Sequence, residues 1–407
     1  MQLFLFTNFF PNPGGEFFIA NEFSIAKKRV EHITIFPLYG KTPKQTPISE
    51  LKVKSLTPVL ISPKHTLNIA VNGLFCWSSF SFHINDFFSQ LLFFKPKKLY
   101  WWLVSVLVTR SILASKSYED IRHQIIHAKQ PVLYFYWADN MAWIIPYLKK
   151  DIGNTPVKIV IRSHRTDLIE HFKANYAPIR RFIFNQANLI TSISNHGFQY
   201  LTAKYPEYNS KFLLARLGVN DNGLNPYKTQ SAIHFISVSN VVALKRLHLI
   251  FNILQNMKTP CVWHHFGDGV LMNELQQLIL NKRNDLEINL YGYVTNETLM
   301  QFYQTNTVDV FINTSSIEGV PVSVMEAMSF GIPIVATNVG GTSELVDIKV
   351  GFLLDANFSP AAVAHQLDDF FYDKIKVIEA RKNARKVFEE KAQAEKNYNY
   401  FYDVILE

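Results

Sequence analysis

Residues 313–346 read NTSSIEGVPVSVMEAMSFGIPIVATNVGGTSELV, and this stretch carries the clearest structural pattern in the chain. It follows an apolar run, Val308–Ile312, whose composition predicts a buried strand. Pro321 suits the first position of a helix, where its missing N–H group costs nothing, and Gly331 suits the C-terminal cap. Ile332–Ala336 then predicts a second strand. The stretch therefore predicts a strand, a loop, a helix and another strand, as in an α/β sheet.

Two glutamates, Glu318 and Glu326, lie in this stretch with seven residues between them. Glu318 falls in the loop directly before the predicted helix, whose N-terminal amide groups and dipole attract phosphate. Glu326 lies about one and a half turns further along that helix. The pair suits a ligand that combines phosphate, hydroxyl groups and ribose, such as a nucleotide sugar. The alternative is a capping glutamate and a surface glutamate.

Short apolar runs alternate with helical patterns along the whole chain, which predicts parallel strands joined by crossover helices. In the first half the predicted strands are Leu3–Phe6, Ile33–Phe36, Pro131–Tyr136, Lys158–Ile161 and Leu189–Ile193. In the second half they are His234–Val238, Cys261–Phe266, Ile288–Tyr291, Val308–Ile312 and Ile332–Ala336. Turn-forming residues between Gly218 and Tyr227 predict a linker between two Rossmann-like halves.

Length and composition restrict the class of protein. The 407 residues, of which 48% are hydrophobic, suffice for two globular domains. Cys76 and Cys261 are the only cysteines, so we expect neither a disulfide framework nor a zinc site, and a reducing cytoplasm fits. The short run Leu3–Phe6 predicts a buried strand rather than a signal peptide. The longest apolar run, Leu99–Val108, is shorter than the about 20 residues that a membrane span needs.

The net charge of +8 is unevenly distributed along the chain. Residues 1–220 hold 26 Lys+Arg and 12 Asp+Glu, a balance of +14, whereas residues 221–407 hold 15 and 21, a balance of −6. No nucleic-acid-binding motif accompanies the basic half, so we expect no nucleic-acid partner. In residues 87–116, Lys95, Lys97 and Lys98 lie among aromatic residues, which suits an anionic membrane surface. The alternative for this segment is a buried helix with a basic loop.

The stretch 313–346 resembles the donor-site motif of the retaining GT-B glycosyltransferases of family 4, also called group 1. The match extends through AMSFGIPIVAT at residues 327–337 and Gly340-Gly341-Thr342 to Glu344. The resemblance implies an α/β fold of the GT-B class, with two Rossmann-like domains that face each other across a cleft. Residues 1–220 would bind the acceptor and residues 221–390 the nucleotide sugar, while residues 391–407 would form a helix that packs back towards the N-terminal domain.

The resemblance also implies roles for residues of the second half. Glu318, with Gly319 and Val320 beside it, would contact the donor sugar, and Glu326 would hold the ribose hydroxyls. Lys245 follows the strand His234–Val238, where a lysine stabilises the charge of a departing diphosphate. Four further residues are predicted donor contacts. Asn240 stands where the family usually has an arginine, and Arg246 could replace that arginine. Tyr293 and Val294 resemble the segment of the family that binds the nucleobase.

We expect no metal and no other cofactor. No Asp-x-Asp pair, which often binds the metal that neutralises a diphosphate, occurs in the chain. His264 and His265 are adjacent in a predicted strand and therefore point to opposite sides, which makes them poor common ligands. Lys245 and a helix N-terminus supply the positive charge instead.

In the first half, Gly14 and Gly15 follow the first strand and resemble the glycine loop that faces the donor phosphates in the family. His164, in the segment Ile161–Asp167, resembles the active-site histidine, which would contact the donor sugar or polarise the reacting hydroxyl. A structural histidine is the alternative. The predicted acceptor contacts are Arg162, Asp167, Ser194, Asn195, Tyr136 and Trp137. A place in the hydrophobic core is the alternative for Tyr136 and Trp137. Helix capping is the alternative for Ser194 and Asn195.

These features predict a retaining hexosyltransferase that moves a sugar from an NDP-sugar donor to a glycan or polyprenyl-linked acceptor of a surface polysaccharide, such as a capsule or O-antigen. It would be cytoplasmic and peripheral on the inner face of the cytoplasmic membrane. Front-face substitution fits retention, and a covalent glycosyl intermediate stays an alternative. A non-catalytic scaffold that binds a nucleotide sugar and a nucleotide-sugar epimerase on the same fold are the other readings.

Overall fold

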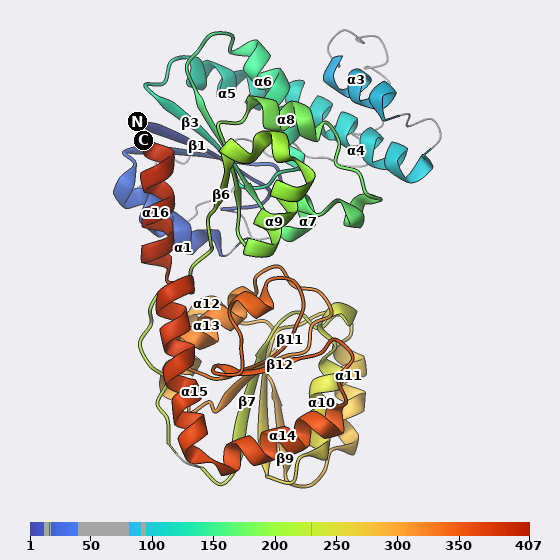
Figure 1. The fold of residues 1–407 in the computed structure, drawn as a ribbon, viewed down its shortest axis with the longest axis vertical. Helices are drawn as coiled ribbons and strands as arrows, with labels where there is room; N and C mark the ends of the chain where they lie inside the picture. The colour runs from blue at the N-terminus through green and yellow to red at the C-terminus, as the bar shows by residue number, and fades with distance from the viewer. Residues whose placement is uncertain (12–15, 17, 40–80, 91–94, 229) are drawn as a thin grey trace. The chain divides into compact units, whose positions relative to one another are not determined.

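The computed structural model describes residues 1–11, 16, 18–39, 81–90, 95–228 and 230–407 (Figure 1). The chain divides into two compact units. Unit 1 comprises Met1–Ala215 together with Tyr398–Glu407, and unit 2 comprises Arg216–Asn397. Each unit contains a six-stranded sheet whose neighbouring strands are all parallel. The chain leaves unit 1 a few residues before the predicted domain boundary at residue 220 and returns to it within its last helix.

The sheet of unit 1 has the strand order β2-β1-β3-β4-β5-β6. Its strands are β1 (Gln2–Thr7), β2 (His32–Pro37), β3 (Pro131–Phe135), β4 (Lys158–Ser163), β5 (Leu189–Ser192) and β6 (Phe212–Leu214). The α-helices of this unit are α1 (Ile19–Arg29), α3 (Ser81–Ser89), α4 (Pro96–Leu113), α5 (Lys116–Ile126), α6 (Ile145–Asp151), α7 (Arg165–Leu168), α8 (Arg180–Gln186) and α9 (Asn195–Lys204). Short 3-10 helices lie at η3 (Asn140–Ile144), η4 (Glu170–Lys173) and η5 (Pro206–Lys211). The central strands are almost wholly apolar because helices cover both faces of a parallel sheet.

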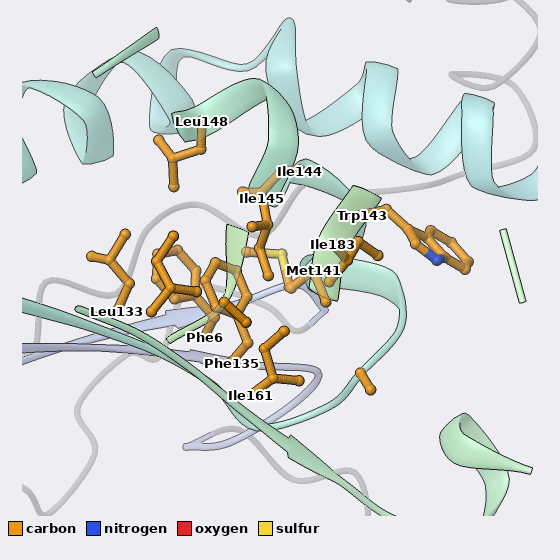
Figure 2. Close-up of a cluster of buried hydrophobic side chains, with 14 of the residues drawn as sticks. Phe6, Leu133, Phe135, Met141, Trp143, Ile144, Ile145, Leu148, Ile161 and Ile183 are labelled. Atoms are coloured by element: carbon orange, nitrogen blue, oxygen red, sulfur yellow. The ribbon is translucent and has the colours of Figure 1, made fainter. Parts of the chain in front are cut away.

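One side of this sheet packs against the segment from η3 to α6 (Figure 2). The rings of Phe6 and Phe135, on neighbouring strands, stack with their centroids 4.3 Å apart. Ile144, Ile145 and Leu148 lie above them in the same buried cluster. This core holds the ends of β1 and β3 at a fixed spacing, and the loops that follow both strands belong to the candidate site.

The sheet of unit 2 has the order β12-β11-β10-β7-β8-β9. Its strands are β7 (Ile233–Val238), β8 (Cys261–Phe266), β9 (Leu286–Leu290), β10 (Val310–Asn313), β11 (Ile334–Thr337) and β12 (Gly351–Leu354). Its α-helices are α10 (Leu247–Asn256), α11 (Met272–Leu278), α12 (Asn296–Thr305), α13 (Val322–Ser329), α14 (Pro360–Tyr372) and α15 (Lys374–Val387), and α16 (Ala394–Leu406) leads back to unit 1. The prediction of two Rossmann-like halves is confirmed.

Around residue 320 the observed helix boundaries differ slightly from the prediction. Pro321 is the N-cap residue and α13 begins at Val322, one residue later than expected. Gly331 follows the C-cap with φ +69°, a left-handed conformation that suits glycine, so the predicted end of the helix is correct.

Sequence analysis missed the edge strands β6 and β12, which have only three and four residues. It also described residues 218–227 only as a linker, but Asn225 in this segment is buried. Its side-chain amide donates hydrogen bonds to the carbonyl oxygens of Tyr303 and Asn306, at 2.6 and 2.7 Å. These bonds make the segment part of unit 2.

In each sheet the strand order reverses once, between β1 and β3 in unit 1 and between β7 and β10 in unit 2. Ligands of open parallel sheets bind at the carboxyl ends of the strands that flank such a reversal. The loops after these four strands are therefore the first places to search for function. Within the parts of the chain that the structure describes, no helix combines the length and the apolar character that a membrane span requires.

Candidate active site

Hydrogen bonds join the loops that follow β7 and β10. The amide of Ser316 donates to the carbonyl of Leu244 at 2.8 Å, and the Thr314 hydroxyl donates to the carbonyls of Lys245 and Arg246. The Arg246 guanidinium donates to the carbonyls of Thr314, Ser315 and Ala356. Arg246 was predicted to contact the donor, but its side chain serves to hold these loops together.

The joined loops bring together Lys245 and Glu318. Lys245 Nζ lies 2.7 Å from Glu318 Oε1, and both side chains are partly buried. Asn313, the last residue of β10, donates from its amide to the same carboxylate oxygen at 3.1 Å. Sequence analysis did not single out Asn313, although a polar residue at the end of an apolar strand was the signal for it. Asn240, in the same β7 loop, is exposed.

Two glycines allow neighbouring loops to approach these two: Gly341, after β11, lies against the β10 loop, and Gly267, after β8, lies against the β7 loop. At Gly341 a Cβ atom would lie 2.7 Å from Val320 Cγ2, and the Gly341 amide donates to the carbonyl of Gly319 at 2.6 Å. At Gly267, with φ +137°, a Cβ atom would lie 1.9 Å from the Ser239 carbonyl oxygen. Larger residues at either position would push the loops apart.

Glu326 lies on α13, and its carboxylate accepts a hydrogen bond from the Asn296 side chain of α12 at 2.8 Å. Although part of the side chain is open, protein atoms surround the carboxylate, and this desolvation raises the pKa of Glu326 to about 7. The hydrogen bond from Asn296 works in the opposite direction and limits the rise of that pKa. The group can therefore change its charge near neutral pH.

Aromatic residues gather at the ends of β8 and β9. The ring of Tyr291 stacks on Phe266, with centroids 4.3 Å apart and planes 3° from parallel. Two residues further on, Tyr293 is 73% exposed and Val294 is half-buried. His264 pairs with His234 at 3.1 Å, and burial lowers the pKa of His264 to about 4. Among the described residues no group of three or more His, Cys, Asp or Glu side chains could hold a metal ion.

In unit 1, His164 follows β4 and is 7% exposed. Three aromatic rings surround it: Trp137 at 4.1 Å between centroids, Tyr136 at 5.2 Å and Phe18 at 6.1 Å. Burial, with a smaller contribution from the nearby Arg162 charge, holds the pKa of His164 well below its usual value, so the imidazole is neutral at pH 7.

Arg162 and Tyr136 were predicted to contact the acceptor, but the structure places neither side chain where an acceptor could reach it. Both are fully buried. The Arg162 guanidinium lies 3.5 Å from the Glu22 carboxylate and donates to the Tyr134 hydroxyl and the Ala215 carbonyl. It also lies over the Phe401 ring at 4.4 Å. This ion pair belongs to the core of unit 1, which explains why a charged residue can stand within a buried strand.

The other predicted acceptor contacts in unit 1 differ in their burial and in their hydrogen-bond partners. Asp167 is buried, and its carboxylate accepts hydrogen bonds from the backbone amides of Ala138 and His164, both at 2.6 Å. Ser194 is the N-cap of α9 and accepts a hydrogen bond from the Gly197 amide at 3.0 Å, so the capping alternative is confirmed for it. Asn195 is exposed. The predicted glycine loop, Gly14 and Gly15, lies outside the described residues.

Comparison with known families and solved structures shows what this chain is similar to. Residues 227–387, most of unit 2, match the family model described as glycosyl transferases group 1. The solved structure of Anabaena HepE in complex with UDP and glucose covers 100% of this chain and 99% of its own length, with a TM-score of 0.64 and 14% identity. At that identity the likeness concerns the fold, which is that of two Rossmann-like domains of the GT-B class.

Two relatives match parts of this chain in sequence. The Escherichia coli K12 protein named putative colanic acid biosynthesis glycosyltransferase WcaL is 26% identical over 235 residues, which are 54% of this chain and 57% of that protein. The Escherichia coli UDP-Gal:alpha-D-GlcNAc-diphosphoundecaprenol alpha-1,3-galactosyltransferase is 32% identical over 111 residues, which are 26% of this chain and 27% of that enzyme. The chain thus aligns with less than two thirds of the length of either relative.

Proposed function

We propose that this protein is a retaining glycosyltransferase of family 4 that transfers a hexosyl unit from an NDP-sugar to a glycan acceptor. The observation that carries the proposal is the Lys245–Glu318 pair, held by Asn313 at the strand reversal of unit 2. It lies within the segment that matches the group 1 family model. The HepE complex with UDP and glucose supports a nucleotide-sugar donor of this kind.

The two partners of the pair receive different roles. Lys245 faces the diphosphate, whose negative charge grows as the bond from the anomeric carbon to the leaving oxygen breaks. Glu318 accepts a hydrogen bond from a sugar hydroxyl. In the absence of donor the two charges neutralise each other at 2.7 Å, which keeps both side chains in place for the donor.

The transfer step retains the configuration of the anomeric carbon. The acceptor oxygen forms its bond on the face from which the diphosphate departs, and its hydroxyl proton passes to an oxygen of the leaving diphosphate. Because Lys245 supplies positive charge at this place, the reaction proceeds without a metal ion. Activity should therefore persist in EDTA, and a complete loss that added Mg²⁺ or Mn²⁺ reverses would contradict this part of the proposal.

Other residues of each unit are assigned the remaining donor and acceptor contacts. Glu326 binds the ribose hydroxyls, and the backbone at Tyr293 and Val294 holds the base. In unit 1 the neutral His164 can both donate and accept a hydrogen bond, which suits a sugar hydroxyl. The half-buried Trp137 presents its ring beside it for the acceptor sugar.

We further propose that the protein works at the cytoplasmic face of an anionic membrane on a polyprenyl-linked acceptor. The relative that uses GlcNAc-diphosphoundecaprenol supports such an acceptor. The second support is α4, which buries Ser105, Val108 and Ile112 but leaves Tyr100 60% and Leu103 46% exposed. At its start, Lys95 and Lys97 are exposed and Lys98 is half-buried. Exposed aromatic and aliphatic side chains next to lysines suit anionic headgroups.

A donor panel tests the catalytic proposal. UDP-, GDP-, ADP- and dTDP-sugars would be offered with a soluble GlcNAc-diphosphate acceptor that carries a short alkyl chain, and the released nucleotide and the product would be measured. We expect one donor to be used, with loss of turnover in Lys245→Ala. Binding without turnover of any donor would favour a scaffold, and isomerised nucleotide sugar without transfer would favour an epimerase.

A further inference from the structure

Three loops meet at the carboxyl edge of the unit 1 sheet, because β1, β3 and β4 are neighbours in it. They begin at Asn8 after β1, at Tyr136 after β3 and at His164 after β4. Two of these loops carry the rings of Trp137 and His164, whose centroids lie 4.1 Å apart with an angle of 35° between the ring planes. Because these rings lie on loops, other groups must hold their geometry. Two buried carboxylates, those of Glu16 and Asp167, bind the loops and can hold the rings in place.

Glu16 ties the first loop to the second. Its side chain is 4% exposed. Oε2 accepts hydrogen bonds from the backbone amides of Phe9 and Phe10, both at 2.6 Å, and Oε1 accepts one from the Asn8 amide at 3.2 Å. Oε1 also accepts the indole N–H of Trp137. Successive backbone amides that converge on one anion form a stable anion nest, so the carboxylate fixes this indole against the β1 loop.

Asp167 ties the second loop to the third. Its side chain is 2% exposed. One carboxylate oxygen accepts the Ala138 amide, and the other accepts the His164 amide. Trp137 is thus held on both sides, through its own indole by Glu16 and through the following peptide by Asp167. The Asp167 carboxylate also holds the backbone of His164, whose ring packs against the indole.

We propose that Glu16 and Asp167 are positioning residues that set the Trp137–His164 ring pair as the binding surface for the acceptor sugar. This inference rests on the proposed function. An indole plane held at one angle offers a flat apolar surface to a sugar ring, while the neutral imidazole beside it binds a hydroxyl. Neither carboxylate touches substrate; each acts through the rings.

Kinetics of three variants test the roles. Glu16→Gln and Asp167→Asn each place an amide NH₂ against N–H groups, so each should raise KM for the soluble GlcNAc-diphosphate acceptor about ten- to a hundredfold. Neither should change the affinity for free nucleotide. Trp137→Phe removes the indole N–H but keeps a ring, and Glu16→Gln should have a smaller additional effect in that background, because the two changes remove the same interaction.

Asp86→Asn is the matched control for stability. Asp86 is also a buried carboxylate of unit 1 that accepts from an aromatic hydroxyl, that of Tyr176, and from a backbone amide, that of Ile179. It lies on α3, away from the strand ends. This variant should lower the melting temperature and leave the acceptor KM unchanged. If Asp86→Asn raised the acceptor KM as much as Glu16→Gln does, the effect would be general destabilisation and the proposal would be wrong.

A measurement without turnover separates this inference from the proposed function. In protein with ¹⁵N-labelled tryptophan, Trp137→Phe identifies the Trp137 indole signal among the six tryptophans. Loss of the bond to a carboxylate should move that proton signal upfield in Glu16→Gln, even if no donor is ever used. An unmoved signal, or an unchanged acceptor KM in both carboxylate variants, would overturn the proposal.

Discussion

Lys245 and Glu318 form one ion pair, yet the proposed roles predict different defects when each is changed. Lys245→Ala removes the charge that stabilises the departing diphosphate and should reduce kcat about a hundredfold or more. Glu318→Gln should reduce turnover with the sugar donor but spare the affinity for the nucleotide alone. Steady-state kinetics and calorimetry with free nucleotide measure the two effects.

The exposed Lys282 of unit 2 provides the control, and Lys282→Ala should behave as wild type. If Lys245→Ala and Glu318→Gln lost only nucleotide affinity, and by equal factors, the division of roles would be wrong.

Glu326 predicts a pH dependence, because desolvation raises its pKa to about 7 from an ordinary 4.5. A carboxyl group with a raised folded-state pKa contributes stability that is fully present below pH 4.5 and is lost as the pH rises through about 7. The wild-type protein should therefore lose on the order of 1–3 kcal/mol of stability from this group over that range. Glu326→Gln should remove this part of the pH dependence, as measured by denaturant unfolding between pH 4.5 and 8.

Glu326 is also the proposed contact to the ribose hydroxyls of the donor. Glu326→Ala should weaken nucleotide binding about ten- to a hundredfold, since a hydrogen bond to a charged group is lost. Unchanged nucleotide affinity in calorimetry would remove Glu326 from the ribose site.

At the scale of single elements, α4 is the test of membrane docking. Replacing Lys95, Lys97 and Lys98 with Gln should weaken binding to anionic liposomes about a hundredfold, because each basic residue near the surface contributes on the order of 1 kcal/mol. High salt should have the same effect through screening. Liposome sedimentation with anionic and zwitterionic vesicles measures it.

Replacing the exposed Lys27, Lys28 and Lys129 of unit 1 with Gln changes the charge equally at other elements and should leave liposome binding nearly intact. Equal losses in both triple variants would show that only the overall charge matters. Transfer to the soluble acceptor should persist in both.

The strands illustrate what sequence can reveal about elements. Short apolar runs such as Pro131–Tyr136 identified inner strands, because both faces of those strands are buried. β6 and β12 lie at sheet edges and are only partly buried, whereas β10, which is no longer than β12, is buried throughout. Their strand character comes from pairing with a neighbour, and pairing leaves little trace in a few residues.

The candidate site likewise contains residues that the sequence could single out and residues that it could not. Resemblance to the motifs of the family singled out Glu318 and His164, and the place of Lys245 after a strand singled out that residue; their roles stay predictions. Neither the role of Glu16 nor the burial of Arg162 could be predicted from the sequence, because their partners lie far away in the chain. Glu16 binds the indole 121 positions later, and Arg162 pairs with Glu22 of α1. Whether a charge is buried and paired depends on contacts that form only in the fold.

At the scale of the whole molecule, the structure predicts that the C-terminal helix supports unit 1. Phe401 is fully buried and lies against the Arg162 guanidinium and the Tyr134 ring, at 4.4 and 5.2 Å. Phe401→Ala should destabilise unit 1 by about 3–5 kcal/mol. Calorimetric melting should show the loss, while nucleotide binding by unit 2 persists below the transition.

Tyr400→Ala is the control on the same helix, because Tyr400 is 52% exposed and should cost little. Equal destabilisation by both variants would mean that this end of α16 does not depend on the buried contact.

The discontinuity of unit 1 has a consequence for how the protein is made. A ribosome completes residues 1–215 and then all of unit 2 before it adds Tyr398–Glu407. Until then the Arg162–Glu22 pair lacks the aromatic cover that Tyr398, Phe401 and Tyr402 provide. We therefore expect unit 2, which is continuous in sequence, to be able to fold before unit 1 has received its last residues.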